Sequence, residues 1–161
     1  MNKKVLFLNQ AAIIAALYIA LLLLLQPISV FAIQFRISEA LTILPYFTPA
    51  AIPGLFVGCF LGNLLVGCAP IDFIFGSLTT LAAATLSYGV RKYKFLVPIP
   101  PIVLNALAVP FILLKAYGTE EGIPFMMATV GAGQVLACGV LGMLLLFALD
   151  KHKRTIFGQF K

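Results

Sequence analysis

The chain has 161 residues, of which 62% are hydrophobic and 10% are charged, and its formal net charge is +6. A soluble domain of this length cannot hide so many apolar side chains from water, which excludes an ordinary globular domain. The Lys and Arg residues gather at the ends of apolar runs, as they do in membrane proteins, and this argues against a basic surface for nucleic acid. We therefore expect a protein that lies in a lipid bilayer.

Five runs of the sequence carry no charged residue, and each is long enough to cross the ~30 Å hydrocarbon core of a bilayer as a helix. The runs are residues 5–35, 40–71, 73–90, 95–114 and 122–149. They lack the strict alternation of polar and apolar residues that the wall of a β-barrel needs. The first run follows Lys3 and Lys4 but is closed by no clear cleavage site, so we interpret it as a retained first span.

The second run decides the number of spans. As one straight helix it would measure about 48 Å, which is too long for a single crossing. It also contains Pro45, Pro49 and Pro53, which interrupt a helix, so we expect two shorter helices joined by a tight turn. The six predicted helices lie near residues 5–26, 38–50, 53–68, 72–90, 95–116 and 124–149.

The distribution of charge favours six spans with both chain ends in the cytoplasm. In that topology the basic clusters at 91–94 and 151–154 fall on the inner side, as the positive-inside tendency requires, and only Arg36 and Lys115 fall outside. Four of the five acidic residues also fall on the outer side: Glu39, Asp72, Glu120 and Glu121. We expect one all-α membrane domain over residues 1–161, a six-transmembrane-helix bundle.

Small residues form two ridges with a spacing of four. The first predicted helix carries alanines and the third carries glycines, and such ridges let helix backbones approach closely in lipid. The alanines are Ala11, Ala12, Ala15, Ala16 and Ala20, and the glycines are Gly54, Gly58 and Gly62. We interpret the glycine ridge as packing inside the bundle. The alanine ridge is equally consistent with internal packing and with docking to a separate membrane partner.

Polar and aromatic side chains gather toward the outer end of the predicted bundle. Buried polar groups in lipid face the bundle or a cavity, where they find hydrogen-bond partners. The residues concerned are Gln34, Phe35, Arg36, Glu39, Asn63, Asp72, Phe73, Asn105, Tyr117 and Gln134. Each amide could instead be a helix-to-helix hydrogen bond. Together they predict a polar cup that opens outward and could hold a small ligand.

The sequence lacks the patterns of an enzyme. Its one histidine, His152, stands among tail lysines, so the usual nucleophile pairs are missing, and no metal-binding or phosphate-loop motif is present. Cys59, Cys68 and Cys138 lie in apolar runs without the spacing of metal ligands. We expect no catalytic site, no metal and no cofactor. A transporter of this kind must take energy from an ion gradient or from partner subunits, and no carboxylate lies at mid-span, which favours partners.

The run QFRISEALTILPYFTPAAIPGLFVGCFLGNLL at 34–65, followed by GCAPIDFIFGSLTTLAAATLSY at 67–88, resembles the QueT family. This family belongs to the substrate-binding S components of energy-coupling factor (ECF) transporters. The six short helices and the alanine ridge on the first helix also resemble those S components over the whole chain.

The resemblance implies a transporter subunit that takes up queuosine precursors, which are 7-deazaguanines such as preQ0, preQ1 or queuine. It implies a multi-pass protein of the bacterial plasma membrane, without an ATPase of its own. Its partners would be a transmembrane coupling subunit and two cytoplasmic ATPases. The alanine ridge would dock on the coupling subunit.

The chemistry of a 7-deazaguanine suits the polar residues at the outer end. One carboxylate, Glu39 or Asp72, could accept hydrogen bonds from its adjacent N–H and amino groups. Its carbonyl needs donors such as Arg36, Asn63, Asn105 or Gln134, with Gln34 near the rim. Its flat rings would stack on an aromatic face supplied by Phe35, Tyr46, Phe73 or Tyr117.

Other functions stay open from sequence alone. The chain could be an S component for another small nutrient, with the same fold and coupling. It could be a membrane scaffold or assembly protein with no transported ligand, or a small ion-coupled exporter. The mass of a copurifying ligand would separate the first from a queuosine-precursor transporter, and a scaffold would show neither a saturable ligand nor association with ATPases.

Overall fold

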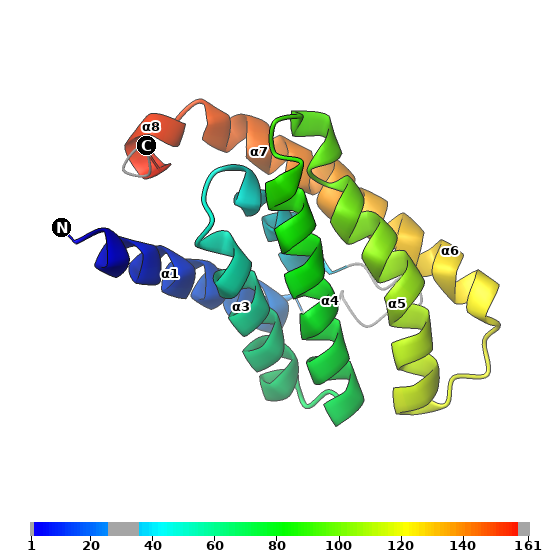
Figure 1. The fold of residues 1–161 in the computed structure, drawn as a ribbon. Coiled ribbons are helices and arrows are strands. Elements are labelled where there is room, and N and C mark those ends of the chain that lie inside the picture. Colours follow the sequence, from blue (N-terminus) through cyan, green and yellow to red (C-terminus); the bar gives the residue numbers. More distant parts are fainter. Residues whose placement is uncertain (1, 26–35, 158–161) are drawn as a thin grey trace.

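The computed structural model describes residues 2–25 and 36–157, and these residues form helices and connecting turns without a β-strand. Figure 1 shows the course of the chain. The elements are α1 (Lys3–Leu24), η1 (Ile37–Tyr46), α3 (Ala51–Val66), α4 (Pro70–Gly89), η2 (Lys94–Leu96), α5 (Ile99–Tyr117), α6 (Ile123–Gln134), η3 (Val135–Leu141), α7 (Gly142–Asp150) and α8 (Lys153–Phe157). The all-helical class expected from the sequence is confirmed.

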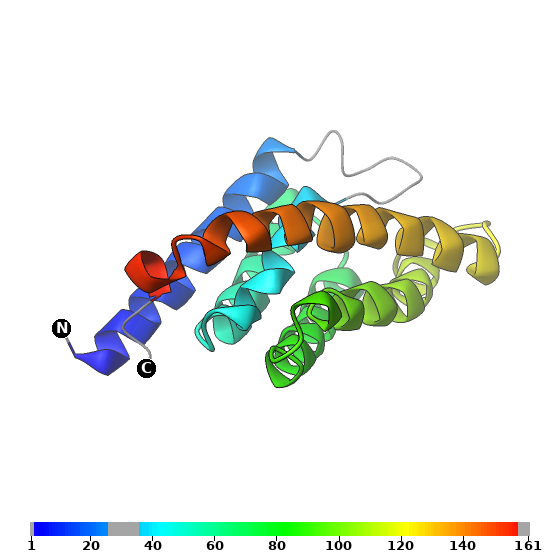
Figure 2. The same cartoon turned by 90° about the horizontal axis from the view of Figure 1, so that it is seen from above.

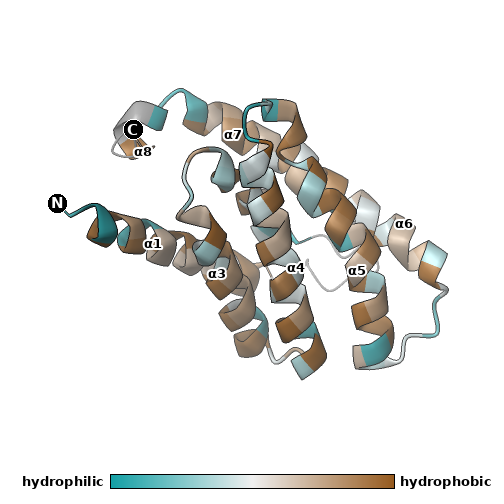
Figure 3. Cartoon of the chain, in the orientation of Figure 1, coloured by the Kyte–Doolittle hydropathy of each residue, from teal (hydrophilic) through white to brown (hydrophobic). Residues whose placement is uncertain are grey.

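Within residues 2–25 and 36–157, four helical stretches are long and apolar enough to cross a membrane by length and composition. They are Lys3–Leu24, Pro70–Gly89, Lys94–Tyr117 and Ile123–Asp150. Figure 3 shows apolar residues along most of each helix, with hydrophilic residues concentrated near the ends and turns. The helix α3 is apolar but has 16 residues, which is about 24 Å. The predicted count of six spans and the sidedness of the termini therefore stay predictions.

The segment predicted as a helix over 38–50 is a 3-10 helix, η1, which ends at Tyr46. Pro45 contributes no backbone N–H, and the next helix begins only after Pro49. All residues from Ser38 to Pro45 are buried, and η1 contacts α1, α3, α4, η3 and α7. The short helix therefore forms the centre of the bundle, with the longer helices around it.

The longer helices pack in chain order around that centre: α1 on α3, α3 on α4, α4 on α5 and α5 on α6. The last run is continuous from α6 through η3 to α7, with a π-helical stretch in the middle, and it crosses the bundle in both views (Figures 1 and 2). A carbon placed on Gly142 would lie 2.9 Å from Ile43 Cγ2, so η1 and this run approach closely.

The two chain ends lie on the same side of the molecule in both views. Near them Lys94 Nζ pairs with Asp150 Oδ2 at 2.6 Å, and the Phe47 ring stacks on Phe157 at a centroid distance of 5.0 Å. These contacts tie the end of η1 and the start of the α5 segment to the C-terminal helices. The opposite end of the bundle holds the turns before α4 and after α5, and the polar cluster described below opens toward it.

The glycine ridge of α3 packs inside the bundle, as the sequence predicted, and its partner is α1. A carbon placed on Gly58 would lie 2.8 Å from Tyr18 Cβ and 3.1 Å from Ala15 Cα. A carbon placed on Gly54 would lie 2.8 Å from the Ala11 carbonyl oxygen. Because these neighbours are backbone atoms or sit next to the backbone, only glycine permits this separation between the two helices.

Candidate functional site

Polar residues from five elements surround a cavity in the half of the bundle away from the chain ends. Its space between atoms is about 350 Å³ when the open mouth is included. The lining residues are Arg36, Glu39, Cys59, Asp72, Gly76, Thr80, Asn105, Val109, Val130 and Gln134. Beneath the mouth the interior leaves room for about one water-sized molecule. A larger ligand therefore requires the side chains at the mouth to move apart.

Glu39 lines this cavity, and only 3% of its surface is exposed. The Tyr18 hydroxyl donates to Oε1 at 2.5 Å, and Asn105 Nδ2 donates to Oε2 at 3.4 Å. The backbone carbonyl of Glu39 accepts from Thr42 Oγ1 at 2.6 Å, which fixes this turn of η1. A carboxylate offers about four lone-pair sites, so Glu39 can accept further hydrogen bonds from a ligand.

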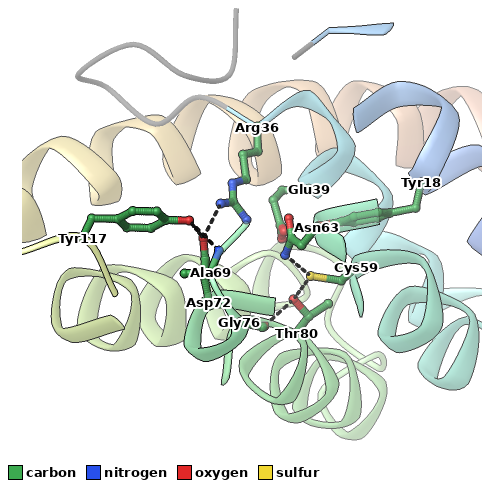
Figure 4. Close-up of polar contacts among 10 residues, drawn as sticks. All are labelled: Tyr18, Arg36, Glu39, Cys59, Asn63, Ala69, Asp72, Gly76, Thr80 and Tyr117. Atoms are coloured by element: carbon green, nitrogen blue, oxygen red, sulfur yellow. Dashed lines mark hydrogen bonds and ion pairs between the residues drawn. The ribbon is translucent and has the colours of Figure 1, made fainter. Parts of the chain in front are cut away.

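Asp72 forms the second acidic centre, at the first turn of α4. Tyr117 donates its hydroxyl hydrogen to Asp72 Oδ2 at 3.1 Å, and Arg36 Nη2 lies 3.9 Å from the same oxygen. The Ala69 N–H in turn donates to the Tyr117 hydroxyl at 3.2 Å. Position in the first turn suits a carboxylate because the helix N-terminus carries partial positive charge. Figure 4 shows Arg36 and Tyr117 reaching Asp72 from different sides.

The floor between the two acids is made by α3 and α4. Cys59 Sγ accepts from Asn63 Nδ2 at 3.4 Å and from Thr80 Oγ1 at 3.5 Å. A carbon placed on Gly76 would lie 3.4 Å from Asp72 Oδ1 and 3.8 Å from Asn63 Nδ2, so this glycine keeps the floor open. The cluster thus carries two carboxylates and one guanidinium, with amides, hydroxyls and a thiol between them (Figure 4).

The walls of the cavity toward α5 and α6 combine apolar and amide groups. Val109 and Val130 supply the apolar surface, and Gln134 stands at the end of α6, where the π-helical stretch begins. Gln134 Oε1 accepts from Cys138 Sγ at 3.1 Å. An enclosed space with apolar walls and a few fixed polar groups is typical of small-molecule sites. Among the described residues, no group of three His, Cys, Asp or Glu side chains could hold a metal ion.

Residues 8–151 match the family model described as QueT transporter. The chain belongs to the QueT transporter family. One similar protein is "Queuosine precursor transporter QueT" of Lactococcus lactis subsp. cremoris (strain MG1363), at 39% identity over 84 residues. The match covers 51% of this chain and 48% of that relative, so the two align over about half their lengths. No solved structure matches this QueT-family chain.

Family membership and the apolar helices together indicate a multi-pass membrane protein. Five of the residues singled out from the sequence line the cavity: Arg36, Glu39, Asp72, Asn105 and Gln134. Asn63 and Tyr117 do not line the cavity themselves, but each bonds to a residue that does: Asn63 to Cys59 and Tyr117 to Asp72. Gln34 and Phe35 lie outside the described residues.

Two aromatic candidates lie elsewhere. The Tyr46 ring packs edge-on against Phe47 at a centroid distance of 4.8 Å and lies near Lys94, at the end with the chain termini. Tyr46 is nine residues along η1 from its start, which is about 18 Å of 3-10 helix, so it cannot share an end with Arg36. Phe73 packs edge-on against Phe60 at 5.3 Å and is not among the residues that line the cavity.

Sequence reasoning missed several members of this QueT-family site. Tyr18 stood out only as a tyrosine within a run of apolar residues, and that isolation was its one signal. Thr80 is a polar residue inside the predicted helix 72–90, and the sequence assigns it no role. Cys59 and Gly76 look like ordinary packing residues in the sequence, because their place at the cavity depends on how α3 and α4 face each other.

The structure divides the alanine ridge of α1 between two faces. Ala15 is buried next to Gly58, and the Ala11 carbonyl oxygen lies beside Gly54. These two alanines therefore belong to the contact between α1 and α3. This contact with α3 agrees with internal packing, one of the two interpretations that the sequence left open for the ridge. Ala12, Ala16 and Ala20 are exposed on the other face of α1, and their contact with a partner stays a prediction.

Proposed function

We propose that this chain is the substrate-binding subunit of a transporter for queuosine precursors, the 7-deazaguanines preQ0, preQ1 and queuine. Support comes from the family match and from the printed name of the relative, which is a queuosine precursor transporter. The observation that carries the proposal is the buried carboxylate of Glu39. It lines the cavity, and some of its lone pairs are free to accept hydrogen bonds from a ligand.

The Glu39 carboxylate fits the edge of the base that carries its N–H and amino donors side by side. Hydrogen bonds to an ionised group are stronger than neutral ones and favour paired donors. Asn105 and Gln134 supply amides at the neighbouring walls for the ring carbonyl. Val109 and Val130 offer apolar surface to the flat rings. Arg36 and Tyr117 stand at the mouth with Asp72, and their displacement would admit the base.

Energy for uptake would come from outside this chain. We propose an ECF module of one transmembrane coupling subunit and two cytoplasmic ATPases, met through the exposed alanines Ala12, Ala16 and Ala20. The chain would act as one domain in a bacterial plasma membrane, with six spans and both ends in the cytoplasm. The clustering of polar contacts at one end of the bundle and basic residues near the other supports this orientation.

Calorimetric titration of the purified protein with preQ0, preQ1 and queuine tests the ligand. We expect saturable binding of at least one base, and a loss of about tenfold or more in Glu39→Gln, because a hydrogen bond to a charged group is worth about 1.5–3 kcal/mol. Glu120→Gln is the matched control, since Glu120 is exposed between α5 and α6. A folded protein that binds none of the three bases would contradict the proposal, and the mass of any copurifying ligand would then name another nutrient.

A further inference from the structure

Tyr18 is an unusual residue for its position. It sits in the middle of α1, between apolar neighbours, and its side chain is completely buried. Its hydroxyl crosses from α1 to η1 and donates to Glu39 Oε1 at 2.5 Å, a contact between residues 21 positions apart. A separation of 2.5–2.7 Å is characteristic of a hydroxyl bonded to an ionised carboxylate. Among the described residues, two side chains donate to the Glu39 carboxylate, and Tyr18 makes the closer contact, since Asn105 lies at 3.4 Å.

The packing of α1 on α3 sets the reach of this hydroxyl. A carbon on Gly58 would stand 2.8 Å from Tyr18 Cβ, so the absence of a side chain at 58 allows α1 to approach. The Tyr18 side chain then points toward Glu39, which lies within the buried stretch Ser38–Pro45 of η1 (Figure 4). The position of the hydroxyl is fixed by backbone packing rather than by a flexible side chain.

A carboxylate in a cavity can turn about its last side-chain bonds, and each orientation presents different lone pairs. With Oε1 held by Tyr18 and Oε2 approached by Asn105, the plane of the Glu39 carboxylate is fixed, and its remaining lone pairs stay available. A base with two adjacent donors benefits from both oxygens only when that plane is aligned with its edge.

We propose that Tyr18 is a positioning residue for the ligand site: its hydroxyl aligns the Glu39 carboxylate so that both oxygens read the paired donors of the base. This inference rests on the proposed function. Tyr18 does not touch the base and acts through Glu39. It makes α1 part of the binding site, although the cavity lining belongs to the other elements.

Two ligands separate positioning from packing. 7-Deazaguanine carries both the ring N–H and the 2-amino group, whereas 7-deazahypoxanthine carries the ring N–H alone. We expect the wild-type protein to prefer 7-deazaguanine by about tenfold or more, since a site built for a donor rejects an analogue that lacks it. In Tyr18→Phe we expect binding of 7-deazaguanine to weaken about tenfold and the preference to fall to about threefold or less.

Tyr88→Phe is the matched control, because it removes a tyrosine hydroxyl at the far end of α4, where the ring lies under Arg91. It should keep both the affinity and the preference. If Tyr18→Phe fails to fold in detergent, p-aminophenylalanine at position 18 retains the ring and a donor, and should keep the preference within about threefold of wild type.

The outcomes separate the two proposals. If the wild type binds neither these two bases nor the queuosine precursors, the proposed function fails and the role of Tyr18 fails with it. If the wild type prefers 7-deazaguanine and Tyr18→Phe keeps the same preference, the positioning role is overturned while the proposed function stands. Equal weakening for both ligands would show that Tyr18 only supports packing.

Discussion

Gly58→Ala probes the contact on which the position of Tyr18 depends. The added carbon would stand 2.8 Å from Tyr18 Cβ, and 3.1 Å from both the Cα and the carbonyl oxygen of Ala15. None of these atoms can rotate away, so α1 and α3 must separate by a few tenths of an ångström. Gly89→Ala is the matched control, because Gly89 ends α4 with no atom within 4 Å of an added carbon.

The expected magnitude follows from the difference between the two substitutions. Both replace a helical glycine by alanine, so the gain in helix propensity of ~1 kcal/mol is similar in the two variants. Crowding a well-packed contact costs about 1–3 kcal/mol, and only Gly58→Ala carries that cost. At ~3 °C per kcal/mol for a chain of this length, Gly58→Ala should unfold about 3–9 °C below Gly89→Ala.

Thermal unfolding in one detergent measures that difference. Gly58→Ala should also weaken binding of the queuosine precursors, because the Tyr18 hydroxyl moves with α1. Equal unfolding temperatures for the two alanine variants would refute the close approach of α1 and α3. A lower unfolding temperature with unchanged ligand affinity would show that the contact matters for stability and leaves the binding site untouched.

Three further substitutions test other parts of the structure. Ala16→Leu, on the exposed face of α1, should reduce uptake and association with the proposed coupling subunit while sparing ligand binding. Ala15→Leu should instead destabilise the chain, because Ala15 is buried. Unchanged uptake in Ala16→Leu would refute docking through that face. Gly76→Ala should fold normally but weaken ligand binding measured by titration, since the new methyl group would lie in the cavity, 3.4 Å from Asp72 Oδ1. Unaltered affinity would show that the ligand binds elsewhere. Lys94→Met should leave the unfolding temperature nearly unchanged, because its pair with Asp150 is partly exposed, and a clear fall in that temperature would show a more deeply shielded pair.

Helix positions were the part of the fold that the sequence predicted best. Apolar runs and prolines placed five of the predicted helices close to α1, α3, α4, α5 and the α6–α7 run. The same signals did not reveal that the segment 37–46 is a short 3-10 helix whose residues Ser38 to Pro45 are all buried. Hydropathy reports that a segment avoids water, and it does not distinguish lipid from the centre of a bundle.

Some residues of the candidate site were predicted from the sequence and others were missed. Arg36, Glu39 and Asp72 were predicted because a charged residue is rare in this chain and each one requires an explanation. Tyr46 was named only as a possible stacking residue, and the structure places its ring against Phe47, near Lys94. Tyr18 was missed because its contact with Glu39 depends on the rotation of α1 about its own axis.

The rotation of α1 about its own axis also determines which alanines pack against α3 and which are exposed. Alanines at spacings of four occupy two adjacent rows on α1, and the sequence offers no way to choose the row that meets Gly54 and Gly58. The structure assigns Ala11 and Ala15 to the contact with α3 and leaves the neighbouring row exposed. Packing between helices, rather than the pattern within one helix, supplied the missing information.

A structure of the protein with preQ1 bound tests the position of the proposed site most directly. We expect the base in the cavity between η1, α4, α5 and α6, with its ring N–H and amino group donating to the two oxygens of Glu39. Tyr18 should remain bonded to Oε1, and Arg36 should have moved from Asp72 to open the mouth. A base bound elsewhere, or beyond hydrogen-bonding distance of Glu39, would contradict the proposal.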